Sequence, residues 1–177
     1  MPTLQVETLT FAFDATVSAG NYDQWQHYTT VWNAPPGGKK AVDVVAVEGV
    51  APQSTAWLIE GKDFRVINKP PKPSNITGLA QLVADKAKDT LAGLAHAQNH
   101  AVVPGEKQLA ANAIASSENR IVLHLEPHTG PHTALFPAGF AASVLQRLRQ
   151  IVQAMDSNPM VLNIANTPAA GVPWKVS

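Results

Sequence analysis

The chain has 177 residues, no cysteine, and 13 basic against 13 acidic residues, a composition that fits one globular domain over residues 1–177. The missing cysteines exclude disulfides, cysteine nucleophiles and thiolate metal sites, and the balanced charge argues against tight non-specific binding of nucleic acid. No apolar run approaches the roughly 20 residues of a membrane-spanning helix, so we expect a cytoplasmic protein that does not enter membranes.

The N-terminal residues combine strand and helix signals. Residues 4–13 mix threonine, valine and aromatic side chains, which predicts a strand, and the Ser-Ala-Gly sequence at 18–20 is expected to break it. Aromatic residues then recur at spacings of three and four, which predicts a short helix over 21–33 with one face packed on a sheet. These aromatic residues are Tyr22, Trp25, Tyr28 and Trp32.

Two apolar runs, 41–47 and 55–60, are separated by a short polar stretch and predict a hairpin of central strands that are buried on both faces. Downstream, the pattern predicts a helix from a cap at Ser74 or Thr77 to about residue 96, and a loop with a short helical piece over 102–117. A strand over 120–125, a helix over 137–155 and a late strand over 160–164 complete a mixed α/β fold.

Two acids and one lysine converge if the hairpin pairs Glu48 with Thr55. That register places Asp43 directly across from Glu60, where like charges about 4.5 to 5.5 Å apart repel each other unless a cation intervenes. Lys62 lies two residues beyond Glu60, on the same face of the strand. The grouping suits phosphodiester hydrolysis, because hard oxygen ligands hold Mg²⁺ and a lysine adds positive charge beside a phosphate. The alternative is an ion pair at a sheet edge.

Asp43 followed by Glu60-Gly61-Lys62 resembles the Asp…(Asp/Glu)-x-Lys signature of the PD-(D/E)XK nuclease superfamily, and the resemblance covers residues 21–125. It implies a restriction-endonuclease-like core of α-β-β-β-α-β order, a central mixed sheet flanked by helices. It also implies that Asp43, Glu60 and the carbonyl of Gly61 bind Mg²⁺ or Mn²⁺ and that Lys62 is the catalytic cation. The superfamily often takes a further acid from the preceding helix, and Asp23 is the tentative candidate.

The resemblance leads us to expect a metal-dependent nuclease that hydrolyses phosphodiester bonds in DNA by metal-activated water. The corresponding class labels are nuclease, endonuclease, hydrolase and DNA-binding protein. A homodimer or a protein partner would help such a small domain to embrace a duplex. The alternative is a non-catalytic binding or assembly domain that keeps the nuclease fold.

Other polar and aromatic residues are expected to be structural. Asp63 and Arg65 predict an exposed ion pair, and Lys86 and Lys88 predict a solvated helix face. The aromatic stripe over 21–33 is expected in the core, with base stacking as the alternative. A second group is expected to be solvated, with zinc binding as the alternative; its members are His124, Glu126, His128 and His132.

Overall fold

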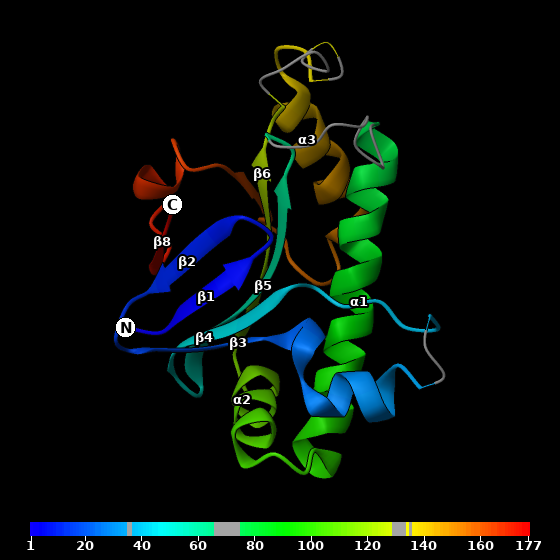
Figure 1. Ribbon diagram of the computed structural model, residues 1–177, viewed down its shortest axis with the longest axis vertical. Coiled ribbons are helices and arrows are strands. Elements are labelled where there is room, and N and C mark those ends of the chain that lie inside the picture. Colours follow the sequence, from blue (N-terminus) through cyan, green and yellow to red (C-terminus); the bar gives the residue numbers. More distant parts are fainter. Residues whose placement is uncertain (35–36, 66–74, 129–133, 135) are drawn as a thin grey trace.

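The computed structural model describes residues 1–34, 37–65, 75–128, 134 and 136–177. Its described elements form a mixed α/β fold of two β-sheets and a small number of helices. Three α-helices lie on one side of the larger sheet, and the smaller sheet lies on the other (Figure 1). The molecule therefore has three layers, with one hydrophobic core on each side of the larger sheet.

The larger sheet has five strands in the order β3-β4-β5-β6-β7. Strands β3, β4 and β5 are antiparallel, whereas β5, β6 and β7 are parallel, so the chain needs a crossover between β5 and β6. The pairing of Glu48 with Thr55 confirms the predicted hairpin register. The strands are β3 (Val17–Asn21), β4 (Val44–Val50), β5 (Gln53–Asp63), β6 (Glu118–Glu126) and β7 (Met160–Leu162).

Strand β5 is buried on both faces, as its apolar sequence predicts. Leu58 joins the core beneath the helices, and its neighbours Trp57 and Ile59 join the core beneath the smaller sheet. Alternate side chains of a strand point to opposite faces, so a strand between two layers must be apolar on both. The polar residues Glu60, Lys62 and Asp63 at its end depart from this pattern.

The crossover consists of α1 (Ile76–His100) and α2 (Pro104–Ile114), and α3 (Phe140–Val152) follows β6. Asn75 caps α1, because its side-chain oxygen accepts a hydrogen bond from the backbone N–H of Gly78 at 2.7 Å. The predicted cap at Ser74 lies outside the described residues, and Thr77 lies inside the first turn. None of the helices described has both the length and the hydropathy needed to cross a membrane.

The smaller sheet contains β1 (Thr3–Val6), β2 (Leu9–Phe13) and β8 (Trp174–Val176). The predicted single strand over 4–13 is therefore wrong, because the chain turns back at Glu7, whose φ is 53°. The predicted break at 18–20 is also wrong, since these residues pair with β4 as part of β3. This sheet covers one face of the larger sheet, where the resemblance implied flanking helices.

The aromatic segment that follows β3 forms two short helical pieces. They are the 3₁₀ turn η1 (Tyr22–Gln24) and the π-helical turn η2 (Tyr28–Trp32), in place of the continuous helix predicted over 21–33. Tyr22 and Trp25 are buried against the helices, which confirms that the aromatic stripe belongs to the core. Asp23 of η1 is thereby held near the start of β4, where the backbone N–H of Tyr22 donates to the carbonyl of Asp43.

Candidate functional site

The structure brings Asp43, Glu60 and Lys62 to one end of the β4–β5 hairpin. The paired ladder ends at Val44 and Ile59, so Asp43 lies just before β4 and is not paired directly with Glu60 as predicted. Asp43 instead turns its carboxylate toward the next residue of β5. Its Oδ2 accepts a hydrogen bond from the backbone N–H of Gly61 at 2.8 Å, which fixes the acid beside the Glu60-Gly61-Lys62 segment.

Glu60 is fully buried and is held between two lysines from different elements. Lys62 Nζ of β5 lies 2.8 Å from Glu60 Oε1, and Lys86 Nζ of α1 donates to both oxygens of Glu60 at 2.7 and 2.8 Å. Lys86 Nζ also lies 3.6 Å from Asp43 Oδ1. The predicted solvated role of Lys86 is therefore wrong. We call Asp43, Glu60, Lys62 and Lys86 the acid–lysine cluster.

Burial and charge act in opposite directions on the titration of this cluster. Burial raises the pKa of Glu60, the nearby Asp43 carboxylate raises it further, and the two lysines partly oppose both effects. Burial by itself would lower the pKa of Lys62, but the nearby carboxylates, Glu60 first and then Asp43 and Glu7, together raise it. Lys62 thus stays protonated at neutral pH and supplies a cation beside the two adjacent acids.

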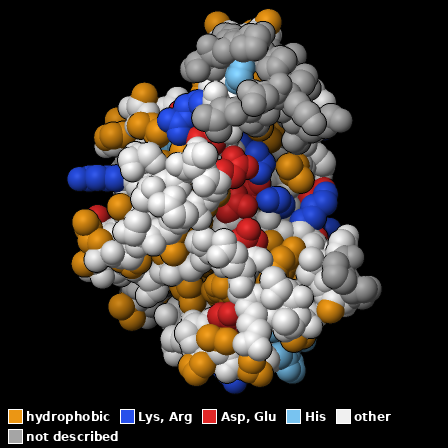
Figure 2. Space-filling model, viewed as in Figure 1, with side chains coloured by type: hydrophobic (Ala, Val, Ile, Leu, Met, Phe, Trp, Pro, Cys, Tyr) orange, Lys and Arg blue, Asp and Glu red, His pale blue; other side chains and the backbone are white. Residues whose placement is uncertain are grey.

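A hollow of about 270 Å³ opens beside Asp43. Asp23 reaches this hollow from η1, and its pKa is raised by burial and by the charge of Asp43. Figure 2 shows acidic side chains gathered at the centre of one face, with lysine or arginine side chains on either side. The hollow is lined by Gln5, Val6, Glu7, Asn21, Asp23, Gln24 and Asp43.

Glu7 is a further acid of the site that sequence reasoning missed. It occupies the turn between β1 and β2, where its Oε2 accepts from the backbone N–H of Asp63 at 2.8 Å and its Oε1 lies 3.7 Å from Lys62 Nζ. The side chain of Glu7 therefore ties the smaller sheet to the end of β5. In the structure Glu7 stands out because it has a positive φ, which is uncommon for a residue other than glycine. The sequence alone does not show that Glu7 adopts this conformation, so it gave no signal for this acid.

Gly61 allows β1 to lie close to β5. A Cβ atom at position 61 would lie 2.7 Å from Cγ1 of Val6, closer than packed carbon atoms approach each other. Valine is stiff at χ1 and has little freedom to move aside. The close approach of the smaller sheet therefore requires glycine at position 61, between Glu60 and Lys62.

Gly61→Ala should lower the free energy of unfolding by about 1 to 3 kcal/mol, the usual cost of overpacking. Val6→Ala in the same chain should recover part of that loss, because it removes the clashing methyl groups. Urea unfolding of the single and double variants measures both effects. Equal stability of Gly61→Ala and the wild type would contradict this close packing.

The predicted Asp63–Arg65 pair is present, but the acid is not exposed. Arg65 Nη2 lies 2.6 Å from Asp63 Oδ2, and the Asp63 side chain is buried. Hydrogen bonds from Arg65, joined by the hydroxyl of Thr8, lower the pKa of Asp63 to about 2. This stabilisation is present above the usual pKa of 3.8 and is lost as the pH falls through 2, so it contributes to stability at neutral pH.

The second group of titratable residues is buried and not solvated as predicted. His124 Nε2 lies 2.9 Å from Glu126 Oε1, and His128 Nδ1 lies 2.6 Å from the carbonyl oxygen of Phe64. His132 lies outside the described residues. Within the described ranges no group of three or more histidine, aspartate or glutamate side chains is arranged to hold a metal ion.

The donors of the acid–lysine cluster nevertheless have the chemistry that Mg²⁺ prefers. Asp43 and Glu60 offer carboxylate oxygens, and Mg²⁺ commonly binds one or two protein carboxylates while it keeps several waters. The hollow beside Asp43 gives space for those waters. Lys86 Nζ now contacts both carboxylates, so an incoming cation would compete with this lysine for the same oxygens.

Comparisons with known proteins give one curated relative and no family. The chain is 28% identical to a cysteine–tRNA ligase of Neisseria meningitidis, over an alignment of 213 residues that covers 100% of this chain and 30% of the relative. The chain thus spans less than a third of the length of that protein. No family model matches the sequence, and no solved structure matches the chain.

This relative corrects the class labels that the motif suggested. We expected nuclease, endonuclease, hydrolase and DNA-binding protein, but the named relative is a ligase that is named for tRNA. Those labels are therefore wrong as descriptions of the chain's known relatives.

Proposed function

We propose that the chain is a nucleic-acid-binding domain on a restriction-endonuclease-like core, and that it binds the phosphate backbone with Mg²⁺ at the acid–lysine cluster. The strand arrangement supports this fold. The antiparallel strands β3, β4 and β5, the helical crossover and the parallel strand β6 match the β-β-β-α-β part of that core, with the acid and lysine on the third strand. The first helix of the core has no counterpart before β3 among the described residues, and η1 and η2 lie between β3 and β4. The likeness is one of fold, and the function rests on the site.

The observation that carries the proposal is the imbalance of charge around Asp43. Glu7, Asp23, Asp43 and Glu60 contribute four carboxylates to the cluster and its hollow, whereas Lys62 and Lys86 contribute two ammonium groups. A phosphate would be repelled by such a group of acids unless a divalent cation bound first. Asp43 and Glu60 would hold that Mg²⁺, and Lys62 would contact the phosphate that it attracts.

RNA is the first nucleic acid to test. The curated relative is named for tRNA, although this chain aligns with only 30% of that protein. The ligands to compare are single-stranded RNA, double-stranded RNA, single-stranded DNA and double-stranded DNA.

The test is fluorescence anisotropy with labelled oligonucleotides, in Mg²⁺ and in EDTA. We expect wild-type protein to bind at least tenfold more tightly in Mg²⁺, and we expect Asp43→Asn to remove most of that difference. Asn keeps an oxygen for the N–H of Gly61 while it removes the charge. Asp14→Asn, an exposed site elsewhere on the chain, is the control. Binding that is indifferent to Mg²⁺ in the wild type would overturn the proposal.

Cleavage of the bound strand is a second candidate, favoured by the position of Lys62. The Lys62 ammonium lies 2.8 Å from the carboxylate of Glu60, which is completely buried and fixes its position. Lys62 is therefore a preorganised cation beside the hollow. Bound Mg²⁺ would polarise the phosphate and lower the pKa of a water. Lys62 would stabilise the negative charge that develops on the phosphate oxygens.

Gel analysis of the same oligonucleotides separates the two candidates. Cleavage requires shorter products that form only with Mg²⁺ and that disappear in Lys62→Met, a variant with an uncharged side chain of similar length. Lys175→Met is the control, because this exposed lysine lies on β8 of the other sheet. If the strands bind in Mg²⁺ but stay intact, the protein binds nucleic acid and does not cleave it.

A further inference from the structure

A ladder of packed rings, one pair of them stacked, lies at the C-terminal end of α1. The rings of His96 and His100 are stacked with centroids 4.2 Å apart and planes 30° apart, and Trp32 of η2 lies 5.5 Å from His96 on an interplanar angle of 36°. His27 holds the ladder to η2, since its Nε2 lies 2.8 Å from His96 Nδ1. His27 is buried whereas His100 is exposed, so the ladder runs from the interior to the surface.

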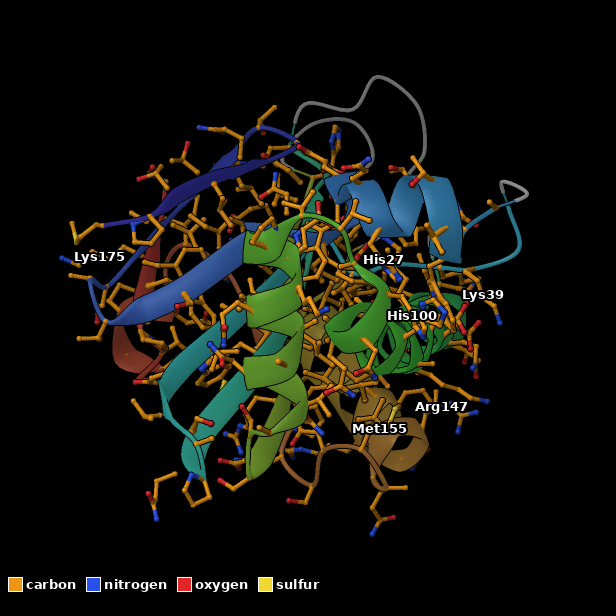
Figure 3. All side chains as sticks on the ribbon, turned by 90° about the horizontal axis from the view of Figure 1, so that it is seen from below. His27, Lys39, His100, Arg147, Met155 and Lys175 are labelled. Carbon is orange, nitrogen blue, oxygen red and sulfur yellow. The ribbon has the colours of Figure 1, made fainter. Side chains whose placement is uncertain are left out.

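Positive charge borders this ladder. Lys39 Nζ lies 5.3 Å from the ring centroid of Trp32, and Lys107 Nζ donates to the carbonyl of Asn99, next to His100. The nearby acid Glu106 is already engaged, because its two oxygens accept the backbone N–H groups of Gln26 and His27. Figure 3 shows Lys39, His27 and His100 on the same side of the molecule, opposite Lys175.

We infer that His100 and His96 form a stacking platform for unpaired bases of single-stranded nucleic acid, with Lys39 and Lys107 beside it for the backbone phosphates. Histidine is one of the side chains on which unstacked bases settle, and such contacts accept any base because every base has a π-face. The rigid partners Trp32 and His27 hold the platform in place before the strand arrives. This inference rests on the proposed binding of nucleic acid.

Helix α1 carries both the platform histidines and Lys86, one residue of the acid–lysine cluster. Lys86 and His100 are 14 residues apart on α1, so the two sites are separated by about 21 Å along the helix axis at a rise of 1.5 Å per residue. A strand of several nucleotides spans that distance. The platform would therefore hold one part of a strand while the cluster holds the phosphate of another.

The test measures the affinity of labelled 12-nucleotide single strands, as RNA and as DNA, for the full chain in Mg²⁺. His100→Ala should weaken binding about tenfold, whereas His100→Phe should keep the wild-type affinity because it keeps a ring that stacks. Asn99→Ala, an exposed neighbour on α1, is the matched control. A strand with abasic sites keeps its phosphates but has no bases to stack there. The His100→Ala variant should therefore bind this strand with the same affinity as the wild type.

Either of two results overturns the platform: His100→Ala binds the base-bearing strand as tightly as the wild type, or it loses as much affinity for the abasic strand. If that happens while Asp43→Asn still weakens Mg²⁺-dependent binding, only the platform is wrong. If the wild type binds no strand in Mg²⁺, the proposed function is wrong as well and the platform falls with it. A preference for RNA or for DNA in the wild type identifies which strand the platform holds.

Discussion

Lys86→Ala is expected to lower the free energy of unfolding by about 3 to 5 kcal/mol at pH 7, the usual cost of removing one partner from a buried ion pair. Glu60 would keep a single ammonium partner while its side chain stays completely buried. Asp43 would lose its nearby cation at 3.6 Å in the same variant. Urea unfolding monitored by circular dichroism measures the loss.

The loss should depend on pH in a defined direction. Burial raises the pKa of Glu60 above its usual 4.5, so the acid takes up a proton in the folded state at a higher pH than in the unfolded chain. A protonated Glu60 needs no cation, and the difference between Lys86→Ala and the wild type should shrink as the pH falls toward 4.5. Lys88→Ala, an exposed residue on the same helix, should change stability by less than about 0.5 kcal/mol. A loss no larger for Lys86 than for Lys88 would contradict the buried pair.

Gly93→Ala is expected to cost about 3 kcal/mol, at the upper end of the range for overpacking. A Cβ atom at position 93 would lie 2.0 Å from the hydroxyl oxygen of Tyr22 and 2.8 Å from Nε1 of Trp32. Tyr22 is fully buried, so its ring can move aside only if its packed neighbours move as well. The substitution should push η1 and η2 away from α1, which would also move Asp23 out of the hollow beside Asp43.

Gly105→Ala provides the matched control for that substitution. Gly105 lies in the first turn of α2 and has no other atom near the position of an added Cβ, so alanine there should raise stability by a few tenths of a kcal/mol. Thermal unfolding of both variants under one set of conditions gives the comparison. If Gly93→Ala is as stable as Gly105→Ala, the close approach of Tyr22 to α1 is wrong.

The convergence of Asp43, Glu60 and Lys62 was predictable because all the information is local. The hairpin has a short connection, its two runs have an alternating apolar pattern, and one register places both acids at the same end. The burial of β5 on both faces follows from the same pattern. The fine geometry of Asp43 was not predictable. The pairing of β4 with β5 stops at Val44 and does not reach Asp43, whose carboxylate accepts a hydrogen bond from the backbone N–H of Gly61.

The roles of Lys86 and Glu7 depend on packing between elements that are distant in the sequence. Lys86 lies on the border of the apolar face of α1, and only the angle at which α1 crosses β5 decides that its ammonium meets Glu60. Glu7 reaches Lys62 because the smaller sheet packs on the back of the larger one. That sheet includes β8 from the C-terminus, and no local pattern in residues 4–13 indicates such a pairing.

Electron paramagnetic resonance of Mn²⁺ counts bound cations directly and tests the central claim, that Asp43 and Glu60 form a divalent-cation site, without the choice of a nucleic acid substrate. Titration of the protein alone should show about one bound Mn²⁺ per wild-type chain, competed by Mg²⁺. Asp43→Asn should lose this ion, and Asp14→Asn should retain it. Equal Mn²⁺ binding by Asp43→Asn and the wild type, or no binding by either, would contradict a cation site at the acid–lysine cluster.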